Sequence, residues 1–230
     1  MIQLHQFAQS PFCDKVRRIL HWKGVTYRTI NVPRAQAPTE LPRLTPTSKV
    51  PVLELEGRRL SDSSDIARQL ESTYPDPPLW PADVRQRSLC HFLEDWADES
   101  LYFYHLRLSY TFPHNARRLV PELMSADGAV LGRLAELVVP GALRAQLHQQ
   151  GLGRKPEAMV VQDLRQHLRS VSGWLDGQQW LVGERLSIAD ISVFAQLSAI
   201  GRTDEGERLL EQHPEVVAWM ARVDDCTAGG

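Results

Sequence analysis

Hydrophobic and polar residues change their pattern near residue 80 of the chain. Before that point, short segments of alternating apolar and polar residues stand between helix-like segments. After it, apolar residues recur at helical spacing almost throughout. The pattern therefore predicts an α/β part followed by an all-helical part.

The first part predicts two strand-and-helix units separated by a loop. Residues 2–7 alternate as a strand does. Ser10-Pro11 then predicts a helix start, because serine is a good N-cap and proline suits the first helical position. The segment 33–47 holds four prolines and is expected to be mostly loop, with one helical turn at 41–44. The remaining elements are expected at 26–32, 50–55 and 58–60 as strands and from 61 or 62 to about 74 as a helix.

The second part begins after a stiff, proline-rich segment at 74–81. Its apolar spacing predicts several helices, and the stretch 110–126 is expected to be irregular or short-helical. The expected helices cover 82–110, 127–150, 156–175, 187–200 and 213–223.

Composition narrows the possible partners. Apolar residues make up 43% of the chain, charged residues 23%, and the net charge is −2, so no overall field would attract nucleic acid or an anionic membrane. The first residues lack a signal-peptide pattern, and no apolar run is long enough to span a membrane. Cys13, Cys90 and Cys226 lie far apart, which argues against a disulfide framework or a metal site. We therefore expect a cytoplasmic protein with no metal, nucleic-acid or membrane partner.

The motif Ser10-Pro11-Phe12-Cys13 lies at a strand-to-helix junction. A helix N-terminus presents free amides and partial positive charge, which stabilise a thiolate. The Ser10 hydroxyl can donate one more hydrogen bond to such a group. The alternative is an ordinary capping serine followed by a small buried cysteine.

Two further motifs have both a binding and a structural interpretation. Val50-Pro51 opens a strand, and a cis peptide there would leave the Val50 backbone free to pair with an extended ligand; the alternative is an ordinary trans proline. Asp62 and Ser63 stand at a helix start and could hold an amino-acid head group, or they could only cap the helix. Ser187 and Asp190 have capping-box spacing, which predicts a structural role.

The order and spacing of these motifs resemble the glutathione transferase superfamily across nearly the whole chain. The matching pieces are Ser-Pro-Phe-Cys-x-Lys-Val-Arg, Lys-Val-Pro-Val-Leu, Asp-Ser and Ser-Ile-Ala-Asp. The resemblance implies an α/β thioredoxin-like, glutathione-binding domain with a mixed four-stranded sheet at 1–77. A linker at 78–83 and an all-α helical-bundle domain at 84–230 that binds the second substrate would follow. It also implies a homodimer and a role in detoxification.

The resemblance implies glutathione as a co-substrate, with Ser10 activating its thiol. Cys13 would be at most an auxiliary thiol, because family members with a cysteine-based cycle carry cysteine where this chain has Ser10. Ser48 stands where many members have glycine. The implied glutathione contacts are Lys49 for the glycyl carboxylate, Val50 for the cysteinyl backbone, Pro51 as the cis proline, and Asp62 with Ser63 for the γ-glutamyl head group.

The second substrate, a small apolar electrophile, is expected in the cleft between the domains. The expected lining is aromatic, although core packing is an alternative for such residues. Three functions remain open: conjugation of glutathione to an electrophile, reduction of a disulfide or peroxide with glutathione, or non-catalytic binding or scaffolding. The expected pocket residues are Phe12, Tyr102, Tyr104 and His105.

Overall fold

Four short strands form one mixed sheet in the first part of the chain. A computed structural model describes residues 1–229. The strands lie in the order β2-β1-β3-β4, with β1 parallel to β2 and antiparallel to β3, and β3 antiparallel to β4. The predicted mixed four-stranded sheet is therefore confirmed. The strands are β1 (Ile2–Gln6), β2 (Tyr27–Asn31), β3 (Val52–Leu55) and β4 (Arg58–Ser61).

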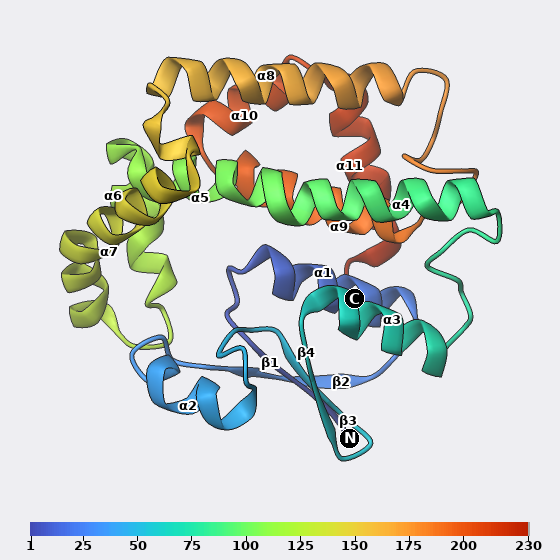
Figure 1. The fold of residues 1–230 in the computed structure, drawn as a ribbon, viewed down its shortest axis with the longest axis horizontal. Helices are drawn as coiled ribbons and strands as arrows, with labels where there is room; N and C mark the ends of the chain where they lie inside the picture. Colours follow the sequence, from blue (N-terminus) through green and yellow to red (C-terminus); the bar gives the residue numbers. More distant parts are fainter. Residues whose placement is uncertain (230) are drawn as a thin grey trace.

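Helices α1 (Pro11–Trp22) and α3 (Ser63–Thr73) lie between the sheet and the helical part of the molecule (Figure 1). The segment predicted as mostly loop instead contains α2 (Ala37–Leu44), a helix of 8 residues. Proline is tolerated in the first turn of a helix, where its missing N–H has no intrahelical partner. One of the four prolines of this segment stands there, so proline content alone was a poor guide.

The second part is helical, as predicted. The helix expected over 82–110 is interrupted by a single turn of π-helix, Ala97–Leu101, called the π-turn below. The stretch 110–126, expected to be irregular or short-helical, contains the short helix α6, and α10 was not predicted. Figure 1 shows α8 above α4 and α9, with α6 and α7 at one end of the molecule. The helices are α4 (Val84–Trp96), α5 (Tyr102–Thr111), α6 (Pro113–Leu123), α7 (Ala129–Gln150), α8 (Glu157–Trp174), α9 (Ile188–Gly201), α10 (Asp204–Glu211) and α11 (Pro214–Thr227).

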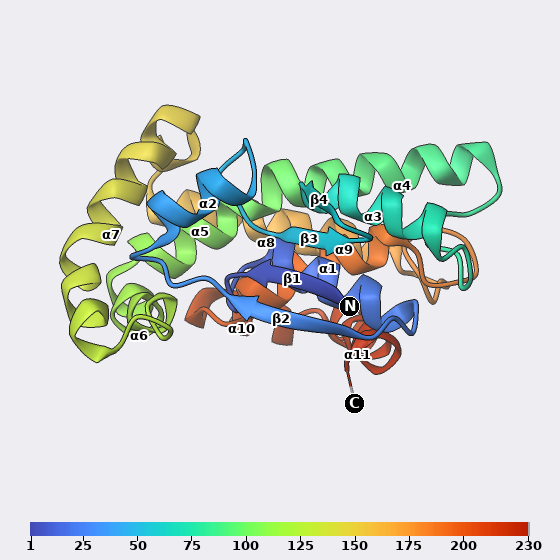
Figure 2. The ribbon, with the colours of Figure 1, turned by 90° about the horizontal axis from the view of Figure 1, so that it is seen from below.

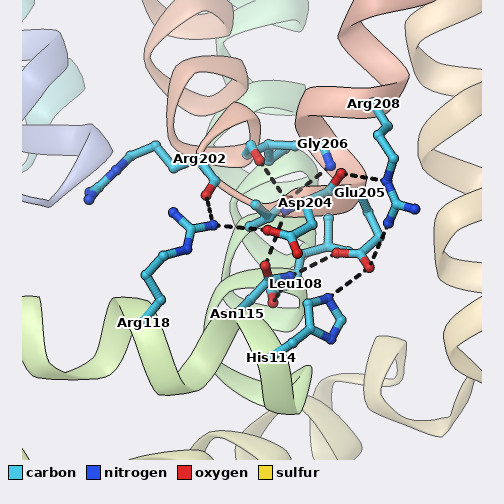
Figure 3. A network of polar contacts seen from close by, with 11 residues as sticks. Leu108, His114, Asn115, Arg118, Arg202, Asp204, Glu205, Gly206 and Arg208 are labelled. Atoms are coloured by element: carbon cyan, nitrogen blue, oxygen red, sulfur yellow. Dashed lines mark hydrogen bonds and ion pairs between the residues drawn. The ribbon is translucent and has the colours of Figure 1, made fainter.

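A polar network fastens α10 to α6 (Figure 3). The Asn115 side chain is fully buried and donates to the Leu108 carbonyl at 3.2 Å and to Glu205 Oε2 at 2.8 Å. Its oxygen accepts from the backbone N–H of Asp204 at 3.1 Å. These contacts join segments about ninety positions apart in the sequence.

One hydrophobic core extends through both parts of the chain. It includes Leu4 and Leu53 of the sheet, Ile19 of α1 and Ile191 of α9, all without solvent exposure. Figure 2 shows the sheet from the side opposite the helical part, with α2 and α7 next to each other at one end. Within residues 1–229, no helix is both long and apolar enough to cross a membrane.

Candidate functional site

A cleft of about 920 Å³ lies between the α/β part and helices α4 to α7. Its α/β wall comes from the loops after β1 and β2, the loop before β3 and the first turn of α3. Its helical wall comes from α4, the π-turn, α5, the end of α6 and α7. All the residues predicted to contact glutathione line this one cleft, namely Ser10, Lys49, Val50, Pro51, Asp62 and Ser63.

Ser10 caps α1 and is half-buried at the cleft. Its backbone is extended, and its Oγ accepts a hydrogen bond from the Cys13 N–H at 3.4 Å. A hydroxyl that accepts in this way still has its own O–H to donate. Ser10 can therefore cap the helix and donate a hydrogen bond into the cleft at the same time.

Cys13 lies on the other side of this cap and has no solvent exposure. Burial raises the pKa of its thiol to about 11, against the smaller lowering effects of Ser10 and Arg17. Cys13 is also absent from the cleft lining. Because only an accessible thiolate is an effective nucleophile, this position argues against the auxiliary role predicted for Cys13.

The loop before β3 brings backbone groups to the cleft. The Val50–Pro51 peptide is cis, as predicted, and both residues precede Val52, the first paired residue of β3. Ser48 has φ 52°, a left-handed conformation that favours glycine, so serine keeps here the turn that glycine would adopt. Lys49 is exposed at the rim.

Asp62 and Ser63 combine the two roles that the sequence left open. Asp62 Oδ1 accepts from the N–H groups of Ser64 at 2.9 Å and Asp65 at 3.2 Å and so caps α3. Its Oδ2 accepts no hydrogen bond from residues 1–229, and the residue is exposed. Ser63 is buried, yet it lines the cleft. Capping therefore leaves one Asp62 oxygen and the Ser63 side chain available to a ligand.

A buried lysine joins the two walls of the cleft, which the sequence analysis missed. Lys15 Nζ of α1 donates to Glu94 Oε1 at 2.7 Å, to Asp98 Oδ2 at 2.8 Å and to Ser64 Oγ at 3.1 Å. Burial raises the pKa of Asp98, and Lys15 opposes this. The signal in the sequence was a charged residue, Lys15, next to Val16 on the apolar face of α1.

Aromatic side chains line the helical wall. The ring of Tyr102 lies 4.8 Å from that of Phe12, measured between centroids, and both line the cleft. His105 also lines it but is 4% exposed, and burial lowers its pKa to about 4, so the ring is neutral at physiological pH. Tyr110 of α5 also lines the cleft on this side. Phe7 and Arg34, in the loops after β1 and β2, line it on the α/β side and were not predicted.

The prediction that Tyr104 lines the pocket is wrong, because this residue lies outside the cleft. Its hydroxyl is 3.5 Å from Asp163 Oδ2, and its ring meets that of His167 edge-on at 5.1 Å. Helical geometry explains the difference, since residues two positions apart on a helix point in different directions. Tyr104 and Tyr102 therefore cannot face one cleft.

Comparisons with known proteins agree with this architecture. Residues 4–78 match the family model for the glutathione S-transferase N-terminal domain, and residues 141–224 match that for the C-terminal domain. A solved glutathione S-transferase from Rhodospirillum rubrum is 27% identical with a TM-score of 0.66, covering 97% of this chain and 88% of that one.

Two curated relatives differ in how much of their length is matched. Glutathione S-transferase U7 of Arabidopsis thaliana is 31% identical over 40% of this chain, which spans only 41% of that relative. FtsZ-localized protein A of Caulobacter vibrioides is 28% identical over 86% of this chain and 76% of its own length. The two family models together cover more than half of the 230 residues. The chain therefore belongs to the glutathione S-transferase family.

Proposed function

We propose that this protein binds glutathione in the cleft and activates its thiol for attack on an electrophilic small molecule. The observation that carries the proposal is the Ser10 hydroxyl, which stands at the N-terminus of α1 with its proton free. It lines the same cleft as the cis-peptide loop and the first turn of α3. A thiol bound along that loop would meet both the hydroxyl and the helix N-terminus.

The chemistry follows from the thiol pKa. An ordinary thiol has a pKa of about 8.5 and is only a few per cent thiolate at neutral pH. Each unit by which the site lowers that pKa corresponds to about 1.4 kcal/mol of selective thiolate stabilisation. The thiol proton passes to solvent, the sulfur forms a bond to the electrophilic carbon, and the leaving group departs with its electron pair.

Glutathione would be held by its ends and its middle. The Val50 backbone would pair with the cysteinyl residue, as in strand addition. Asp62 Oδ2 and Ser63 would receive the γ-glutamyl head group, and Lys49 the glycyl carboxylate. Glutathione must bind here for the proposal to hold.

Calorimetric titration of glutathione into wild type, Ser63→Ala and Ser10→Ala tests this assignment. We expect Ser63→Ala to weaken binding at least tenfold. Ser10→Ala should still bind but lose the shift in thiol pKa, followed by thiolate absorbance. Ser72→Ala, an exposed serine on α3, is the matched control and should bind as wild type does. No binding at millimolar glutathione would refute the proposal.

Protein binding is a second candidate function, and two observations favour it. FtsZ-localized protein A aligns over 86% of this chain. Helix α7 also exposes several large apolar side chains, among them Val130, Leu134 and Leu137. The same titration separates the two functions, because a chain that binds no glutathione would be left with the second.

We also expect a homodimer, as the family resemblance implies. Size-exclusion chromatography with light scattering checks this, with an expected mass of twice 26.1 kDa. A mass of 26.1 kDa at micromolar concentration would refute it.

A further inference from the structure

Arg34 lies in the loop after β2, and its backbone is anchored to the helical part. The N–H groups of Arg34 and Ala35 donate to Asp127 Oδ2 and Oδ1, each at 2.9 Å. Asp127 stands between α6 and α7. The loop is therefore held in position by backbone contacts that do not depend on the Arg34 side chain.

The Arg34 guanidinium uses only part of its hydrogen-bonding capacity. Its Nε donates to the Leu123 carbonyl at 2.9 Å, and its Cζ lies 4.0 Å from the centroid of the Phe7 ring. Within residues 1–229, its two terminal nitrogens have no hydrogen-bond partner. The planar pair of donors that suits a carboxylate is thus unoccupied.

The surroundings of this cation are apolar and aromatic. Arg34 lines the cleft together with Phe7, Phe12, Tyr102 and Tyr110. Burial lowers the pKa of Arg34, while Tyr110, Tyr102, Cys13 and Asp127 act in the opposite direction. Both Asp127 oxygens already accept from backbone N–H groups. Arg34 is half-buried, and within residues 1–229 no carboxylate meets its terminal nitrogens, so an anionic ligand could form charge-assisted hydrogen bonds with them.

We propose that Arg34 binds the carboxylate of the second substrate and that this substrate is an aromatic electrophile carrying an acid group. Its ring would lie against Phe12 and Tyr102 while the acid meets the free nitrogens of Arg34. The proposal rests on the proposed function, because it assigns the second substrate of the same cleft. It replaces the purely apolar electrophile that the sequence alone led us to expect.

A pair of matched ligands tests this without any turnover. We would titrate 1-naphthoate and neutral 1-naphthamide into the full chain by calorimetry. Wild type should bind naphthoate at least tenfold more tightly than naphthamide. Arg34→Gln should abolish that preference with the amide affinity unchanged, and Arg34→Lys should keep part of it. Arg43→Gln, at an exposed arginine on α2 that makes the same change in charge, should bind both ligands as wild type does.

Saturating glutathione should leave the naphthoate affinity within threefold, because a second-substrate site must be free when glutathione is bound. Competition between them would assign Arg34 to a carboxylate of glutathione and overturn the proposal. Equal binding of both ligands by wild type, or equal weakening of both in a folded Arg34→Gln, would also overturn it. If glutathione does not bind but the naphthoate preference persists, the anion site stands and the transferase function fails.

Discussion

Two serines at helix starts, Ser10 of α1 and Ser187 of α9, carry the same local signal but end in different environments. Ser187 is 1% exposed, and its Oγ donates to Asp190 Oδ2 at 2.8 Å. The capping box predicted for Ser187 and Asp190 is confirmed. Ser10 only accepts, from Cys13 N–H, and its hydroxyl faces the cleft.

The difference lies in whether the protein itself uses the hydroxyl proton. At α9 the proton is taken by a buried carboxylate that also accepts from Leu181 N–H at 2.8 Å and Trp219 Nε1 at 2.9 Å. At α1 no protein acceptor takes it within residues 1–229. The same residue type is thus a structural element in one place and a free donor in the other.

Disrupting the buried hydrogen bonds around Asp190 should have the largest effect on stability. Asp190→Asn replaces a carboxylate that accepts four hydrogen bonds with an amide that turns donors toward donors. We expect a loss of about 3 kcal/mol or more in the free energy of unfolding, because buried polar groups lose their partners. Urea denaturation measures this, and Asp204→Asn, at a half-exposed residue, is the control. A loss below about 1 kcal/mol, similar to the control, would contradict the buried network.

Acid should lower the stability of the protein through a second buried group, His105. Its pKa is about 4 in the folded protein against 6.5 ordinarily, chiefly through burial. Below pH 6.5, His105 takes up a proton in the unfolded chain but stays neutral in the folded protein. The free energy of unfolding therefore falls as the pH drops from 6.5 toward about 4. By about pH 5 the loss attributable to His105 should be about 2 kcal/mol.

Comparing the pH dependence of unfolding in wild type and His105→Gln isolates this contribution, because the carboxylates act equally in both proteins. The variant should lose less stability between neutral and acid pH. Parallel curves would mean that His105 titrates normally.

Substitution of Ser10, whose hydroxyl faces the cleft, should have a smaller effect on stability. Ser10→Ala removes a cap whose hydrogen bond is long, at 3.4 Å, so we expect a loss of about 1 kcal/mol or less. Ser187→Ala should cost more, because it removes a buried hydroxyl and with it one of the four donors to Asp190. Equal losses in urea denaturation would show that the two caps do not differ as described.

Thiol labelling should have no effect on stability and only report access. Cys226 is exposed, whereas Cys13 and Cys90 are buried. Brief treatment of the native protein with iodoacetamide should therefore add one label, at Cys226, as read by peptide mass spectrometry. Rapid labelling of Cys13 would restore it as an auxiliary thiol.

Sequence patterns predicted the elements that local chemistry determines. The strand at 2–7, the helix after Ser10-Pro11 and the helix after Ser187 follow from alternation and capping and appear within one or two residues of the expected bounds. Helix α10 begins after the N-cap Thr203, whose Oγ accepts from Gly206 N–H at 3.1 Å, so a local signal for it was present and was missed. Helix α2 was missed because prolines favour loops, although Pro38 stands in its first turn and Pro42 lies inside it. Neither a threonine cap nor the place of a proline within a helix is read from hydrophobic periodicity alone.

The same limit applies to the cleft. Motif spacing led to the α/β wall, where the predicted residues lie in loops or at the starts of α1 and α3. The helical wall depends on which face of α5 points inward, so Tyr102 was assigned correctly to the lining and Tyr104 was not. Arg34 could not be recognised, because its environment is made by a tertiary contact with α6. For Lys15 the sequence showed a charge on the apolar face of α1, but not its partners on α4 and the π-turn.

The π-turn has a consequence for how this wall can vary. An α-helix rotates by about 100° per residue, so one residue more or less in a turn changes the phase of everything after it. A one-residue deletion before Asp98 in the π-turn would move Asp98 away from Lys15, whereas a deletion after Asp98 would leave Glu94 and Asp98 in place beside Lys15. In that case α5 would rotate relative to α4 and present other side chains to the cleft. A single codon thus separates the rotational setting of α4 from that of α5 within the helical wall.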